Sequence, residues 1–188
     1  SARVADLVGA RLADSGGWIS FADYMDLVLY APGLGYYSAG AQKFGPAGDF
    51  VTAPGLGSLF AGCLARVAGQ TLDQLDGGVV LEVGGGTGAL AADVLRALRA
   101  NPPRQYLLLE VSADLRERQH AVLAARVPEL LDRVQWLDRL PATPLTGILI
   151  ANEVLDALPA ERFTMQDGNP RQLGVRLQGG KLSWSSMP

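Results

Sequence analysis

Apolar side chains recur along the first part of the chain at the spacing of one face of an α-helix. Residues 2–13 and about 56–75 show this three- or four-residue spacing. Between them, Ser20 is followed three residues later by Asp23, which resembles a capping box and predicts that a helix covers residues 21–30. We therefore predict three helices before residue 76.

From Val79 onward, short apolar runs alternate with helical stretches. Helical stretches near 89–99 and 113–125 separate the first three strand-like runs, and the four runs cover 79–83, 106–110, 134–137 and 147–151. This alternation predicts an α/β fold with a mainly parallel sheet and right-handed crossovers. After Pro159 the pattern becomes two-residue alternation over 162–166, 172–178 and 181–184, which predicts antiparallel edge strands.

The length of 188 residues favours one integrated domain. Within it we expect an N-terminal helical and lid segment over residues 1–76, and a Rossmann-like core over 77–188. The stretch from Gly33 to Pro54 is rich in glycine, proline and aromatic residues, and it is too long for an ordinary connection. We interpret it as a candidate lid over a binding site.

Composition argues against several classes of function. With 48% hydrophobic and 19% charged residues the chain is globular, and a net charge of −3 with pI 5.1 disfavours nucleic acid as a partner. One cysteine and one histidine cannot form a Cys/His metal cluster, so we expect no metal, and we expect Cys63 to be buried and His120 to face away from the site. No apolar run approaches the roughly 20 residues of a membrane helix, and no signal peptide is evident, which indicates a cytoplasmic setting.

The strongest chemical signal is a glycine run, Gly84, Gly86 and Gly88, between a strand and a helix. Glycines are suited to such a turn because it needs unusual backbone angles and close approach of a ligand. The spacing also fits a dinucleotide-binding fingerprint, so an NAD-dependent oxidoreductase stays open as an alternative. Glu82, two residues before the first glycine, favours a cationic ligand such as S-adenosylmethionine.

Polar residues follow each of the next strands, where ligands of open α/β sheets bind. Glu110 ends the second strand, at the position that accepts ribose hydroxyls in Rossmann-type folds, and Asp138 follows the third, where it could accept the adenine amino group. After the fourth strand, Asn152 and Glu153 would face a methyl acceptor. If residues 154–158 are helical, Asp156 shares a face with Glu153; the alternative is a helix start with a solvated Asp156.

Several motifs together resemble the MidA-like class I methyltransferases, a family that includes a mitochondrial complex I assembly factor that methylates a protein arginine. The resemblance covers about residues 19–163 and is carried by Gly35-Tyr36-Tyr37, Phe44-Gly45-x-x-Gly48-Asp49-Phe50-x-Thr52-Ala53-Pro54, Glu82-x-Gly84-x-Gly86-x-Gly88, Glu110-x-Ser112-x-x-Leu115-Arg116-x-x-Gln119 and Asn152-Glu153-x-x-Asp156-Ala157-x-Pro159. It implies a class I methyltransferase sheet, S-adenosylmethionine as cofactor, and a protein side chain as acceptor: an arginine, with a respiratory complex I subunit as one candidate.

The resemblance also implies roles for single residues. Ser112, Asp49 and Thr52 join the cofactor contacts, the last two from the lid, while Glu153 and then Asp156 are the candidates to orient a guanidinium. The family is usually longer than this chain and ends in a hairpin that is not evident here, so we expect a sheet truncated at its carboxyl end. An assembly protein that retains the cofactor fold to hold a partner subunit is a second hypothesis.

Overall fold

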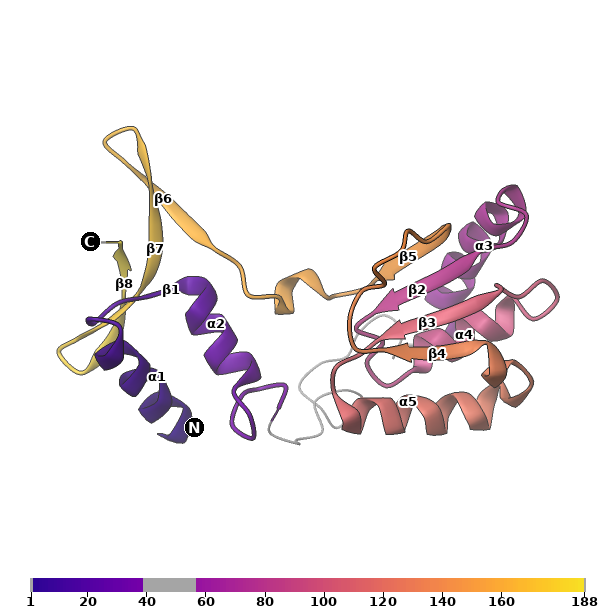
Figure 1. Ribbon diagram of the computed structural model, residues 1–188, viewed down its shortest axis with the longest axis horizontal. Helices are drawn as coiled ribbons and strands as arrows, with labels where there is room; N and C mark the ends of the chain where they lie inside the picture. The colour runs from indigo at the N-terminus through magenta and orange to yellow at the C-terminus, as the bar shows by residue number, and fades with distance from the viewer. Residues whose placement is uncertain (1, 39–56, 188) are drawn as a thin grey trace. The chain divides into compact units, whose positions relative to one another are not determined.

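The computed structural model describes residues 2–38 and 57–187. These residues fall into two compact units: residues 2–38 with 155–187, and residues 57–154. Figure 1 shows the antiparallel strands of the first unit and the parallel sheet of the second. The fold class predicted from the alternation of strands and helices is confirmed in the second unit.

The second unit is built on a four-stranded parallel sheet in the order β4-β3-β2-β5. The chain enters at β2, moves outward to β3 and β4, and then returns to the other side of β2. The order therefore reverses between β2 and β5, which is where open α/β sheets bind their ligands. The strands are β2 (Val79–Val83), β3 (Gln105–Leu109), β4 (Val134–Leu137) and β5 (Gly147–Ala151).

Three α-helices pack against this sheet, α3 beside α4 and α4 beside α5 (Figure 1). Parallel pairing puts Val80, Leu108 and Ile150 on the same face of their strands, and all three belong to one buried cluster with residues of the three helices. Glu82 is paired with Leu108 and Ile150, so its side chain also points toward the helices. The helices of this unit are α3 (Ser58–Gln74), α4 (Ala89–Ala97), α5 (Ala113–Arg126) and the 3-10 helix η2 (Pro128–Arg133).

The first unit joins two N-terminal helices to antiparallel strands from the C-terminal part. Val8, Leu12, Ile19 and Val175 form its buried cluster. Ser20 caps α2, since its Oγ accepts a hydrogen bond of 3.0 Å from the backbone N–H of Asp23, as the capping pattern predicted. The elements are α1 (Ala2–Asp14), β1 (Ile19–Ser20), α2 (Phe21–Tyr30), the 3-10 helix η3 (Leu155–Ala157), β6 (Arg162–Gln166), β7 (Asn169–Gln178) and β8 (Lys181–Ser186).

The strands after Pro159 are antiparallel, as predicted, but they do not form an edge of the parallel sheet. They form a second sheet, in which β7 pairs with β6, β8 and β1, and Ile19 lies opposite Val175. The compact units also differ from the expected division at residue 76. Helix α3 packs against α4 and β5 of the parallel sheet, whereas residues after 155 associate with the N-terminal helices.

Cys63 is exposed, so the expectation that it is buried was wrong. The buried stripe of α3 consists of Ala61, Ala65, Ala68 and Leu72, which follow helical spacing. Cys63 stands two positions after Ala61, which is more than half a turn around the helix. Of the candidate lid, residues 39–54 lie outside the described residues. Within the described part of the chain, no helix is both long and apolar enough to cross a membrane.

Candidate functional site

A tight glycine turn connects β2 to α4. Gly84, Gly86 and Gly88 all have left-handed backbone angles, with φ of 67°, 52° and 82°. Residues with a Cβ rarely adopt these angles, which explains the glycine spacing. A Cβ built at Gly86 would meet no atom within 4 Å, so the backbone there borders open space that a ligand could fill.

Gly88 differs from Gly86 because a neighbouring helix approaches it closely. A Cβ at Gly88 would lie 2.9 Å from the Cα of Gln119 on α5. We expect Gly88→Ala to lower the free energy of unfolding by about 2–4 kcal/mol, since it combines a left-handed angle with a backbone clash. Gly86→Ala also places a Cβ on a left-handed backbone angle but causes no clash, so it should lower the free energy of unfolding by only about 1–2 kcal/mol. Urea unfolding of the two variants measures the difference, and equal losses would contradict this packing argument.

Glu82 is buried beneath the glycine turn, with 2% of its surface exposed. Its Oε2 accepts a hydrogen bond of 2.5 Å from the Tyr106 hydroxyl, and its Oε1 lies 3.5 Å from the position of a Cβ on Gly85. Burial raises the pKa of Glu82 to about 7, although the Tyr106 hydrogen bond lowers it in part. The pKa of Tyr106 is raised well above its usual value by its own burial and by the Glu82 charge.

This buried acid predicts a pH dependence of stability. Because the folded-state pKa of Glu82 lies above its unfolded value, the folded state binds the proton more tightly. The free energy of unfolding should therefore fall as pH rises from about 4.5 to 7, by up to about 3 kcal/mol from this group. Glu82→Gln should remove that contribution, so its stability relative to the wild type should increase from pH 5 to pH 8. Urea unfolding across this range measures the trend, and parallel profiles for the two proteins would refute it.

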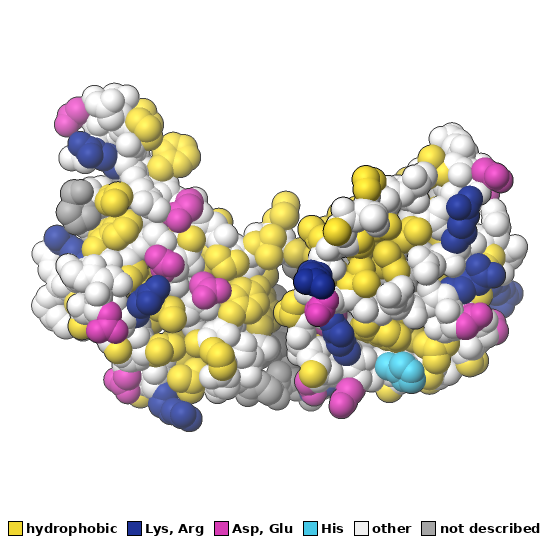
Figure 2. Space-filling view, in the orientation of Figure 1, with side chains coloured by type: hydrophobic (Ala, Val, Ile, Leu, Met, Phe, Trp, Pro, Cys, Tyr) yellow, Lys and Arg dark blue, Asp and Glu magenta, His cyan; other side chains and the backbone are white. Residues whose placement is uncertain are grey.

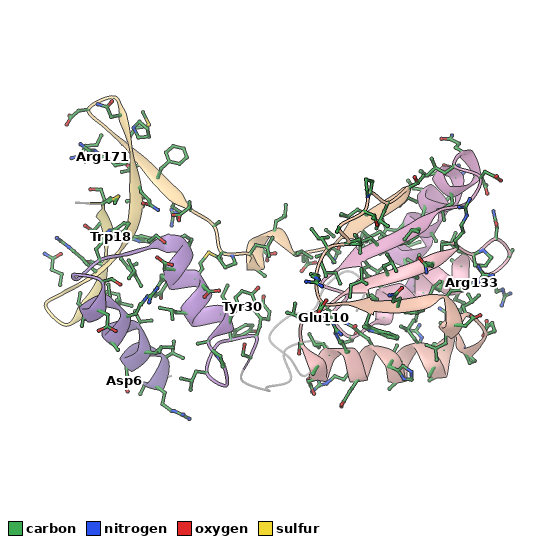
Figure 3. The ribbon with its side chains drawn as sticks, in the orientation of Figure 1. Asp6, Trp18, Tyr30, Glu110, Arg133 and Arg171 are labelled. Atoms are coloured by element: carbon green, nitrogen blue, oxygen red, sulfur yellow. The ribbon has the colours of Figure 1, made fainter. Side chains whose placement is uncertain are left out.

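Glu110 lies at the carboxyl end of β3, beside the start of α5 (Figure 3). Its Oε1 accepts a hydrogen bond of 2.9 Å from the backbone N–H of Ser112, and its Oε2 accepts one of 3.2 Å from Nε2 of Gln119. Arg116 donates from Nε to the Glu110 backbone carbonyl at 2.6 Å. Burial raises the pKa of Glu110, while hydrogen bonds from Ser112, Gln119 and Val111 and the charge of Arg116 oppose the shift.

The Glu110 carboxylate retains some hydrogen-bonding capacity. An ionised carboxylate has about four acceptor positions; the Ser112 N–H bonds to Oε1 and the Gln119 amide to Oε2, and the Val111 N–H also contributes. The capacity that is left suits a ribose hydroxyl. The open space at Gly86, Glu82 on β2 and Glu110 after β3 therefore fit a nucleoside that carries positive charge.

The other predicted cofactor contacts occupy less enclosed positions. Ser112 is the N-cap of α5, where its Oγ accepts a hydrogen bond of 3.4 Å from the Leu115 N–H. Asp138 is exposed immediately after β4, and the Glu110 N–H donates to the Leu137 carbonyl just before it. Asp49 and Thr52 lie outside the described residues, so their roles stay predictions.

The segment after β5 has an unusual backbone at Glu153. This exposed residue has a φ of 51°, a left-handed angle that is strained for a residue with a long side chain. Residues 155–157 form only a 3-10 turn, so the helix that would have put Glu153 and Asp156 on one face does not form. Asn152 is half-buried beside Glu153, whereas Asp156 belongs to the other compact unit.

Gln119 was not among the predicted contact residues, yet it touches several of them. It is fully buried and contacts Glu110, Gly86 and Trp136. The signal in the sequence was its place on α5: it lies four residues from both Leu115 and Leu123, at a position where an apolar side chain is expected. His120 is exposed on α5 (Figure 2), and its ring lies 5.6 Å from the Trp136 ring, centre to centre. In the described ranges, no group of His, Cys, Asp and Glu could hold a metal ion.

Comparison with known proteins relates this arrangement to methyltransferases. Residues 63–188 match the family described as "Putative S-adenosyl-L-methionine-dependent methyltransferase". The chain is 29% identical to the protein arginine methyltransferase NDUFAF7 homologue, mitochondrial, of Drosophila melanogaster over 82% of this chain and 40% of that protein. It is 31% identical to the Bos taurus protein over 79% of this chain and 40% of that one. The chain thus spans less than half the length of these curated relatives.

Solved structures agree with this relationship. A superfamily member from Burkholderia thailandensis, bound to S-adenosyl-homocysteine, is 44% identical and superposes with a TM-score of 0.89 over all of this chain and 50% of the other. A native structure from the same organism is 42% identical, with a TM-score of 0.84 over 48% of its length. The family match covers about two thirds of the sequence, and it confirms both the predicted resemblance and the predicted cofactor class. This chain therefore belongs to the family of S-adenosyl-L-methionine-dependent methyltransferases.

Proposed function

We propose that this chain binds S-adenosylmethionine at the carboxyl edge of its parallel sheet, and that the protein transfers the methyl group to an arginine of a protein substrate. The observation that carries the proposal is the Glu110 carboxylate, held beside an open glycine turn at the point where the strand order reverses. The bound S-adenosyl-homocysteine of the Burkholderia thailandensis relative supports it, and so do the names of the curated relatives.

Different residues of the chain would contact different parts of the cofactor. When bound, S-adenosylmethionine supplies a methyl group on a positively charged sulfur. Glu110 would accept the ribose hydroxyls, Asp138 would accept the adenine amino group, and Gly86 would let the ligand approach the backbone. Glu82 lies beneath this turn, and its ionised form would favour the positive charge of the ligand.

The acceptor side of the site would be formed by the segment after β5. Methyl transfer is an in-line displacement, so the main requirement is to hold the acceptor nitrogen in line with the methyl carbon and the sulfur. An arginine is cationic, and Glu153 would orient its guanidinium and favour the form whose lone pair can attack. We propose Asp156 and Asn152 as further contacts to the acceptor. The strained backbone at Glu153 supports this assignment, because such strain clusters at functional positions.

The acceptor protein is a finer proposal that rests on the relatives alone. Curated relatives carry the name protein arginine methyltransferase at about 29% identity, which supports an arginine on a protein. A subunit of respiratory complex I is the acceptor that the family resemblance implies. Candidate lid residues Asp49 and Thr52 would add polar contacts to the cofactor.

Two measurements on the purified chain test cofactor binding without a known substrate. Mass spectrometry should detect S-adenosylmethionine or S-adenosylhomocysteine that co-purifies with the protein. Calorimetry should then show that S-adenosylhomocysteine binds and that NADH does not. Tight NADH binding without S-adenosylhomocysteine binding would overturn the proposal in favour of an oxidoreductase. A chain that binds S-adenosylhomocysteine, but transfers no label from labelled S-adenosylmethionine to any protein of a bacterial lysate, would favour the assembly role.

A further inference from the structure

We propose that Gln119 is a positioning residue for cofactor binding: its side-chain amide fixes the Glu110 carboxylate and the Gly86 carbonyl in the arrangement that receives the nucleoside. The inference rests on the proposed function and extends it to a residue on α5. Gln119 itself lies beneath the site, so it would act through its two neighbours.

The geometry links three separate elements through one amide. Nε2 of Gln119 donates to the Gly86 carbonyl at 3.0 Å and to Oε2 of Glu110 at 3.2 Å. Its Oε1 accepts a hydrogen bond of 2.9 Å from Nε1 of Trp136 on β4. A single side chain thus connects the glycine turn after β2, the acid after β3, and β4.

These partners also determine which way the amide points. The Trp136 indole N–H is only a donor, so it must face the amide oxygen, while the Gly86 carbonyl and the Glu110 carboxylate are acceptors and must face the amide nitrogen. All three partners are therefore satisfied in one orientation. No polar side-chain atom buried in the described residues lacks a hydrogen-bond partner.

No other side chain of similar size reproduces this pattern. An ionised glutamate could still accept from Trp136, but it has no donor and would place a second negative charge beside Glu110. Methionine has a similar length but provides neither the donor nor the strong acceptor. Helix α5 has little room to shift and restore the lost hydrogen bonds, because Gln119 already lies close to Gly88. A Cβ built at Gly88 would be 2.9 Å from the Gln119 Cα.

Charged and titratable groups from three elements surround the amide. Glu110 follows β3, Arg116 and His120 lie on α5, and Glu82 on β2 is hydrogen-bonded to Tyr106 on β3. The His120 ring lies 5.6 Å from the Trp136 ring, centre to centre. The carboxylate introduced by Gln119→Glu would face Glu110 directly, and the two would share one proton as pH falls.

The test measures S-adenosylhomocysteine binding by calorimetry at pH 6 and pH 8 in four proteins: the wild type, Gln119→Glu, Gln119→Met and a control, Gln105→Glu. Gln105 is exposed at the amino end of β3, so the control makes the same chemical change at the opposite edge of the sheet. Circular dichroism and thermal unfolding establish that each variant folds, and the Trp136 indole resonance reports the hydrogen bond that Gln119→Glu retains.

We expect Gln119→Glu to bind S-adenosylhomocysteine at least about 30-fold more weakly than the wild type at pH 8. The loss of affinity should be smaller at pH 6, where a proton shared with Glu110 restores a hydrogen-bond donor. Gln119→Met should weaken binding about 10-fold at both pH values, and Gln105→Glu should match the wild type. Recovery of affinity at low pH is a response that a general packing defect would not give.

The failures are distinguishable. A wild type that binds no S-adenosylhomocysteine refutes the proposed function itself. A wild type that binds, together with Gln119 variants of equal affinity, overturns only the role of Gln119. If Gln119→Glu does not fold, Gln119→Met decides alone, and wild-type affinity in that variant overturns the inference.

Discussion

Glu110→Gln should lower the affinity for S-adenosylhomocysteine about 100-fold, because the neutral amide replaces one acceptor oxygen with a donor at the position proposed to receive two ribose hydroxyls. The wild-type affinity should also weaken as pH falls through the pKa of Glu110, which burial raises, since the protonated acid loses acceptor capacity. Calorimetry of both proteins between pH 5 and pH 8 measures the two effects.

A ligand-side control separates a direct ribose contact from general damage to the site. Glu110 also accepts from Ser112 and Gln119, so its replacement could disturb the turn without any role in binding. The wild type should prefer S-adenosylhomocysteine over its 2′-deoxy analogue, and Glu110→Gln should lose this preference. A variant that binds weakly but keeps the full preference for the 2′-hydroxyl would show that Glu110 does not contact the ribose.

Glu153→Gly should decrease methyl transfer to protein arginine at least about 100-fold while it leaves S-adenosylhomocysteine affinity nearly unchanged. The same change should leave the fold as stable or raise the free energy of unfolding by up to about 1 kcal/mol, because glycine adopts the left-handed angle of this position without strain. A stability gain joined to a loss of turnover is the pattern of a residue kept for function. Transfer of label from S-adenosylmethionine, measured beside urea unfolding, tests both parts.

Two further variants make the result interpretable. Asp76→Gly relieves a similar left-handed angle, φ 50°, in the same compact unit, so it should gain similar stability and keep full turnover. Glu153→Gln keeps the backbone and removes only the charge, and it should lose turnover like Glu153→Gly. Full turnover in Glu153→Gln would exclude a role for the carboxylate in orienting a guanidinium.

Several parts of the fold could be predicted because they depend on near neighbours in the chain. The strand over 79–83 and the helix over 21–30 have the predicted bounds, since their periodicity and caps are local features. The glycine turn was predictable for the same reason: left-handed angles at Gly84, Gly86 and Gly88 are a property of the backbone itself. The family motifs also predicted the cofactor class, S-adenosylmethionine.

The surroundings of the site residues were harder to predict. The sequence indicated an acid at Glu82, but its burial follows from a register that aims it at the helix layer, beside Tyr106 from the next strand. The expected face shared by Glu153 and Asp156 depended on a helix, but Glu153 adopts a left-handed angle and residues 155–157 form only a 3-10 turn. The spacing of apolar residues gives no information about the burial of Glu82 or about the backbone angle of Glu153.

By itself, the sequence determined the local elements, the parallel α/β unit and the chemical character of the strand ends, because these follow from side-chain spacing and from glycine's backbone freedom. Only the tertiary structure decided that the last strands form a separate sheet, in which β7 pairs with Ile19, and that Gln119 joins the glycine turn to Glu110. The physical reason is the same in both cases. A hydrophobic pattern states that a face will be covered, whereas the partner that covers it is chosen by packing and hydrogen bonding between residues far apart in the chain.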